Sequence, residues 1–163
     1  MTLDITDGLD LIRLRASENR SLAVVITSGE SPDPQVSVAN ATLIEHPVTG
    51  GSVVAFVSRR GTKLRNLRTH RRATLLFQAG WEWVATRGDI ELSGPDDPHP
   101  DIDDTAQQRL LRDIFRAAGG SHPDLEQYDR TMLAERRCAV LLTPEHIWTN
   151  PPGSEHEQPG ALT

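Results

Sequence analysis

Apolar runs and Pro/Gly-rich turns divide the first half of the chain into short strands. Val and Ile are frequent in 21–27, which therefore favours strand structure, and the apolar run within 52–58 is predicted to be another strand. Apolar and polar side chains alternate over 35–44, as in a half-buried strand. The turn segments 28–34 and 47–51 separate these runs. Connections this short favour antiparallel pairing.

Three more strands are predicted after these, over 73–78, 81–86 and 89–93. The Ala-Gly pair at 79–80 and the Arg-Gly pair at 87–88 suit tight hairpin turns between them. A seventh and last strand is predicted after the helices, over residues 138–143 with an extension toward Trp148.

Helical spacing of apolar residues marks the remaining segments. The first helix runs over 7–17 with Asp7 as its N-cap, and one or two helical turns begin at Thr62 as an N-cap. The clearest helix is 103–118, which begins with acids and carries an apolar stripe. Another helix follows from Pro123 to Arg136.

The order of these elements predicts the fold class. Six strands come first and a helix pair comes late, which is an α+β order and not a βαβ alternation. Closing an antiparallel sheet removes its edge strands. We therefore expect a mainly β (α+β) fold over 1–149, a small antiparallel β-barrel with peripheral helices, followed by a disordered tail over 150–163, which is rich in Pro and Gly.

Composition excludes several classes of function. The net charge of -6 disfavours general binding to nucleic acid or anionic membrane, and no apolar run approaches the roughly 20 residues of a membrane span. The N-terminus lacks the basic start of a signal peptide, and the single cysteine, Cys138, lies in an apolar run as a core residue would. Both observations fit a cytoplasmic protein.

One segment of the chain is strongly basic. Residues 59–72 carry seven Arg and Lys residues and no acid, whereas the rest of the chain has ten basic and 23 acidic residues. The segment follows a predicted strand and enters a helix, so its side chains lie near free N–H groups, where phosphate binds readily. The candidates are Ser58, Arg59, Arg60, Thr62 and Lys63. A solvated basic face is the alternative, and scarce aromatics disfavour nucleic acid.

Other chemistry has little support in the sequence. Trp81 and Trp83 are two residues apart and are predicted on one strand face, either as core residues or as a wall against a flat ring. The chain has no GxSxG, GxxxxGK[ST] or GxGxxG motif. Its six histidines show no HxxxH or HExxH spacing, so no metal site is predicted. The acidic pair Asp96-Asp97 is interpreted as solvated loop.

At these residues the chain resembles the pyridoxamine 5′-phosphate oxidase-like, FMN-binding split-barrel superfamily. It is most similar to the branch of flavin- and deazaflavin (F420)-dependent oxidoreductases common in actinobacteria. The similarity covers 34–43, 58–77, 80–97 and 109–148 in the family's order. The KxxNLR pattern at 63–68 is a moderately specific part of it.

The resemblance implies a split antiparallel β-barrel with peripheral helices. It also implies a homodimer with two cofactor sites at the subunit interface and hydride transfer on a small-molecule substrate. The residues beside the cofactor ring would be Ser37, Val38, Ala39 and Asn40. Those at its phosphate would be Ser58, Arg59, Arg60, Thr62 and Lys63, and Trp81 would approach from the other subunit. Some relatives have an arginine where this chain has Gly61 or Thr62. The cofactor carries the chemistry, so we assign no catalytic side chain.

The sequence leaves three hypotheses: an F420-dependent enzyme, an FMN-dependent enzyme and a non-enzymatic protein. F420 is preferred because Arg65, Arg68, Arg71 and Arg72 continue the basic segment as a track for its anionic tail. FMN on the same fold is the alternative. A carrier or sensor of flavin, deazaflavin or haem is the third possibility.

Overall fold

The computed structural model describes residues 1–151, so most of the predicted tail, 152–163, lies outside the described residues. The strands are β1 (Thr2–Leu3), β2 (Leu22–Thr27), β3 (Gln35–Glu45), β4 (Ser52–Ser58), β5 (Arg72–Ala79), β6 (Glu82–Ser93) and β7 (Cys138–Thr149). The helices are α1 (Ile5–Glu18), α2 (Thr62–Thr69), α3 (Asp104–Ala117) and α4 (Leu125–Ala134). Among the described helices, none has the length and apolar character needed to cross a membrane.

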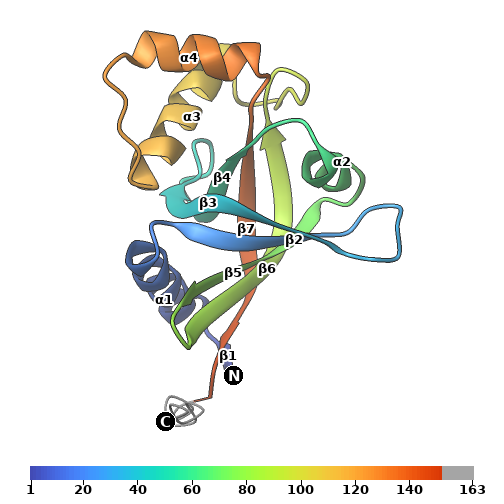
Figure 1. Cartoon of the computed structure of the whole chain (residues 1–163), viewed down its shortest axis with the longest axis vertical. Helices are drawn as coiled ribbons and strands as arrows, with labels where there is room; N and C mark the ends of the chain where they lie inside the picture. Colours follow the sequence, from blue (N-terminus) through green and yellow to red (C-terminus); the bar gives the residue numbers. More distant parts are fainter. Residues whose placement is uncertain (152–163) are drawn as a thin grey trace, which may run out of the picture.

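The strands form a closed antiparallel barrel (Figure 1). Their order is β1-β7-β4-β3-β2-β5-β6, and a further pairing of β6 with β7 closes the sheet. Every pairing is antiparallel, as the short connections require. The predicted fold class is confirmed.

Two helices contribute to the core inside the barrel. Ile12 and Ala16 of α1 and Leu64 and Leu67 of α2 are buried in the same cluster as Phe56. Their helical spacing predicted this inward face. The predicted core position of Cys138 is confirmed, since only 1% of it is exposed.

The other two helices cover part of the barrel's outer surface. Leu111 and Ile114 of α3 and Tyr128 of α4 pack on Ala55 of β4 and Leu141 of β7. These helices lie together above the barrel in Figure 1, away from α1. They leave the outer face of β2 and of the first half of β3 uncovered. Exposed there are Leu22, Val36 and Val38, at 43%, 62% and 55% of their surface.

Helix starts differ from the prediction by a few residues. The N-cap of α1 is Asp4, which accepts the Asp7 amide, so Asp7 lies in the first turn. The N-cap of α2 is Gly61, and Thr62 is the first helical residue. In each case a residue that suits a cap also suits the first turn, and the local sequence alone does not separate the two positions.

The predicted hairpin at 87–88 is wrong. β6 runs without a turn from Glu82 to Ser93, and its pairing with β7 shifts register between Arg87 and Gly88. A Cβ at Gly88 would lie 1.7 Å from the carbonyl oxygen of Thr143. The glycine therefore permits a bulge with close backbone approach. The predicted total of seven strands matches only because this false break offsets the missed strand β1.

Candidate cofactor site

The first half of β3 has a free backbone edge. Its pairing with β2 extends from Gln35 to Asn40, but its pairing with β4 begins only at Ala41. The carbonyl oxygen of Val38 lies 3.4 Å from Nζ of Lys63, which donates to it, so the backbone of Val38 faces away from β2. Backbone groups of alternate residues point to the same side of an antiparallel strand. Val36, Val38 and Asn40 thus offer N–H and C=O groups at this gap in the barrel.

Side chains on the same stretch alternate between the interior and the surface. Ser37 and Ala39 are half-buried, whereas Val38 and Asn40 are exposed. The hydroxyl of Ser37 is buried and finds no hydrogen-bond partner within residues 1–151. The predicted ring-binding set is therefore divided: Val38 and Asn40 face outward, and Ser37 and Ala39 contribute mainly backbone and interior packing.

Lys63 stands where α2 meets this open edge. Its ammonium lies 5.4 Å from the centre of the Phe56 ring and has no carboxylate partner in the described part of the chain. Burial lowers the pKa of Lys63, because removing water disfavours the charged form. A cation that is desolvated and unpaired gains most from an anionic ligand. Among the residues predicted to bind phosphate, Lys63 therefore has the surroundings that most favour an anion.

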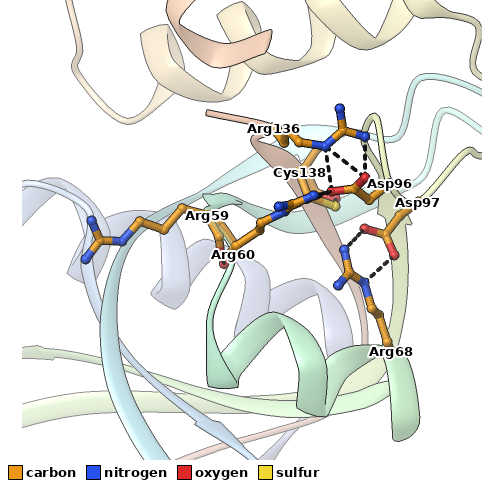
Figure 2. Close-up of polar contacts among 9 residues, drawn as sticks. Arg59, Arg60, Arg68, Asp96, Asp97, Arg136 and Cys138 are labelled. Atoms are coloured by element: carbon orange, nitrogen blue, oxygen red, sulfur yellow. Dashed lines mark hydrogen bonds and ion pairs between the residues drawn. The ribbon is translucent and has the colours of Figure 1, made fainter. Parts of the chain in front are cut away.

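The two arginines that precede α2 have different surroundings (Figure 2). The guanidinium of Arg60 donates to Asp96 at 3.1 and 3.2 Å, and Arg136 binds the same carboxylate. Hydrogen bonds from Arg136 and then Arg60 hold the pKa of Asp96 well below its usual range. Arg59 points away from this cluster and has no ion pair with a described residue. An anionic ligand at Arg60 would have to compete with Asp96, whereas Arg59 is free to bind.

Asp97, the other acid of the predicted solvated pair, is also not free in solvent. Asp97 binds Arg68 through two hydrogen bonds, of 2.7 and 2.8 Å, and only 7% of its side chain is exposed. Cys138 lies beside this pair in Figure 2, and burial raises the pKa of its thiol to about 12. The thiol is therefore neutral and no nucleophile. Asp96 and Asp97 are structural acids that fix the loop after β6 against the basic segment.

The predicted basic track is only partly available. Arg72 binds Glu145 at 2.5 Å and also contacts Asp89, and Arg68 is held as described above. Arg65 donates to the hydroxyl of Thr62 at 3.2 Å and, like Arg71, makes no ion pair within the described chain. The free cations of the segment are thus fewer than its composition indicated.

Two hydroxyls of the predicted phosphate set are already engaged. Ser58 is buried and donates to the carbonyl oxygen of Arg59 at 3.2 Å. Thr62 accepts from Arg65. Ser58 therefore shapes the turn, and Thr62 is the more accessible of the two.

A single chain does not bring Trp81 to the rest of the set. Trp81 lies in the turn between β5 and β6 and not on the strand with Trp83, and 58% of it is exposed. α2 ends before β5 begins, so the whole length of β5 separates Trp81 from Lys63. The amide of Asn150 donates to the carbonyl oxygen of Trp81 at 3.3 Å. The predicted shared strand face of the two tryptophans is wrong, because the turn includes the first of them.

The structure also joins two histidines and a glutamate that the sequence does not associate. Nε2 of His46 and of His99 lie 3.3 and 2.8 Å from Oε2 of Glu91. Nδ1 of His46 accepts the backbone amide of Val48, and Nδ1 of His99 accepts that of Asp101. Each neutral ring therefore carries its proton on Nε2 and donates it to Glu91. A metal at Nε2 would force that proton onto Nδ1, against a backbone N–H, so the cluster is built for the carboxylate.

The closed antiparallel barrel, with an open edge on β3 and with α1 and α2 contributing to its core, has the split-barrel fold that the sequence resemblance implies.

Comparison with known proteins supports the fold. No family model matches the chain. A solved pyridoxamine 5′-phosphate oxidase-related, FMN binding protein from Nostoc punctiforme is 16% identical, with a TM-score of 0.58 over 91% of this chain and 86% of that one. A solved F420 reductase is 12% identical, with a TM-score of 0.55 over 80% and 91%. A heme binding protein from Mycobacterium smegmatis is 15% identical, with a TM-score of 0.55 over 88% of this chain and 53% of that one. Such likeness establishes the fold, and function has to be argued from the site.

Proposed function

We propose that this chain is an oxidoreductase that holds a phosphate-bearing flavin-type cofactor, with F420 preferred, in the gap between β3 and α2. The observation that carries the proposal is the open edge of β3 beside the half-buried Lys63, which has no ion-pair partner within residues 1–151. Planar tricyclic rings present N–H and C=O groups at their rim, which suit a free strand edge. Their phosphate suits the half-buried ammonium of Lys63.

The cofactor, once bound, supplies hydride transfer to or from a small organic substrate. The protein's own residues bind and orient it. Val38 offers backbone groups to the ring rim, and the exposed side chains of Val36 and Val38 give the ring an apolar surface. Lys63 neutralises the phosphate. A buried, neutral Cys138 and the absence of a nucleophilic motif agree with chemistry supplied by the cofactor.

The preference for F420 over FMN rests on charge beyond the phosphate. Arg59, Arg65 and Arg71 have no ion pair with a described residue, in a protein with a net charge of -6. The anionic oligoglutamate tail of F420 would gain from these cations, and the attraction should weaken as salt rises. The test is competitive binding of F420 and FMN at low and high ionic strength. FMN binding as tight as F420 at low salt, or F420 affinity without salt dependence, would favour the FMN alternative.

A homodimer is part of the proposal. Leu22, Val36 and Val38 are exposed on the face that no helix of residues 1–151 covers, and Trp81 is exposed in the turn between β5 and β6. A second copy would bury this face and could bring its Trp81 to the site, which one chain does not do. We expect light scattering to give twice the 18.0 kDa chain mass at micromolar concentration. A Leu22→Glu variant, at an exposed residue outside the predicted ring-binding set, should be monomeric and should bind cofactor poorly. A monomeric wild-type protein would count against the shared site.

A non-enzymatic carrier is the second candidate, since one neighbour of the same fold is a heme binding protein. Absorption spectra of protein titrated separately with F420, FMN and haem distinguish the candidates. Turnover of a bound flavin or deazaflavin with a reductant or an oxidisable substrate would support the enzyme. Tight haem binding without flavin binding would support the carrier.

A further inference from the structure

A cavity of about 440 Å³ lies at the border between the covered and uncovered parts of the barrel. It is lined by Asn40 of β3 and Val57 of β4 on the barrel side and by the C-terminal end of α3 and by α4 on the other. Asn40 is the last residue of the open edge, so the cavity begins where the proposed ring site ends. Its volume is in the range of small-molecule sites.

Both charged residues on the cavity wall are cations. Arg20 and Arg137 are among the lining residues, and no carboxylate is. Arg20 has no ion pair with any residue of 1–151, and Arg137 uses Nε and Nη2 for Glu135, at 2.6 Å each. A guanidinium has five N–H donors, so Arg137 keeps donors for another acceptor.

The backbone carbonyl oxygens at the C-terminal end of α3 are not free to pair with Arg20 and Arg137. A helix leaves its last four carbonyl groups without helical partners, which favours cations. Here the amides of Ala118, Gly119 and Gly120 and the hydroxyl of Thr42 take four carbonyl groups of the last turn. The cavity therefore presents donors and few acceptors.

The rest of the wall is apolar and partly flat. The rings of Phe115 and Tyr128 stack with their centres 4.8 Å apart, and Met132 and Ile114 complete the wall. The hydroxyl of Tyr128 is turned to the carbonyl oxygen of Leu111 at 3.2 Å. A Cβ at Gly120 would lie 2.3 Å from the Phe115 ring, so the glycine is what lets this ring lie flat there.

We propose that this cavity is the substrate site and that it binds small carboxylates with a flat apolar body. The carboxylate would lie between Arg20 and Arg137, and the body against Phe115. This inference rests on the proposed function, because the position of the cavity beside Asn40 would bring the substrate next to the cofactor ring.

The binding test uses cofactor-free protein and 2-naphthoate as the probe, measured by isothermal titration calorimetry. We expect 2-naphthamide, the neutral analogue, to bind at least tenfold more weakly. Arg20→Gln and Arg137→Gln should each weaken 2-naphthoate at least tenfold, since each removes a charge-assisted contact. Arg116→Gln is the matched control: it removes an exposed arginine of the same region that does not line the cavity. It should leave the affinity within twofold.

Equal affinity for the acid and the amide would overturn the proposal, as would equal losses in Arg137→Gln and Arg116→Gln. Thermal unfolding of each variant identifies any loss caused by misfolding, and Arg20→Lys should restore part of the affinity. Cofactor binding is measured separately by absorbance. Carboxylate binding without cofactor binding would reject the proposed function alone, and the reverse result would reject the substrate site alone.

Discussion

Replacing Lys63 by alanine removes the amine, together with most of its apolar stem, from the proposed cofactor site. In the free protein the amine gives little to the fold. Its contact with the Val38 carbonyl oxygen, at 3.4 Å, is too long to be strong, and burial lowers its pKa. We therefore expect Lys63→Ala to change the free energy of unfolding by less than about 1 kcal/mol. A charge-assisted contact to phosphate contributes roughly 1.5–3 kcal/mol. Its loss should raise the Kd about ten- to a hundredfold.

The assay is absorbance titration with F420 and with FMN, alongside thermal unfolding. Lys63→Met keeps the apolar stem beside Phe56 and should lose as much affinity as Lys63→Ala. Arg65→Ala, one helical turn away, removes a cation that contacts only Thr62 within the described chain, so it should leave FMN binding nearly unchanged. Binding of either cofactor by Lys63→Ala within twofold of wild type would contradict the role assigned to the amine. An equal loss of FMN affinity in Arg65→Ala and Lys63→Ala would contradict it as well.

Deprotonation of Lys63 should make cofactor affinity depend on pH. Its folded-state pKa lies below the ordinary 10.5, so cofactor affinity should fall as pH rises through that lowered value, and the fall should vanish in Lys63→Met. The pKa of Glu91 is lowered, chiefly by the His99 hydrogen bond. The stabilising effect of the Glu91 carboxylate is present above the ordinary carboxyl pKa and is lost as pH falls through the lowered folded-state pKa. In Glu91→Gln the free energy of unfolding, measured by denaturant titration at acid pH, should therefore depend less on pH. Zinc should not raise the melting temperature, because Nδ1 of His46 and of His99 already accept backbone amides. Gly88→Ala should destabilise the barrel by about 1–3 kcal/mol or more in denaturant unfolding, because its Cβ would meet the backbone.

Local pattern predicted most of the fold. Continuous apolar runs such as 52–58 became buried strands, and the stripe over 103–118 became α3 with Asp103 as its cap. These predictions held because both signals depend on a few neighbouring residues. The predicted break at 87–88 failed because a glycine permits a bulge as readily as a turn, and only the partner strand β7 decides between them.

The chemistry of the site was predicted less completely, because it depends on which distant residues meet. The basic segment and Lys63 were visible in the composition of 59–72. The ion pair of Arg60 with Asp96 was not visible in the sequence, because 36 residues separate the two and closure of the barrel brings them together. The strands, the core faces and the presence of a cationic segment are local properties, so the order of residues was enough to predict them. Charge pairing and backbone exposure are set by contacts between segments far apart in the chain. For that reason the folded barrel was needed to show which cations lack an ion pair, where the β3 edge opens and which walls enclose the cavity.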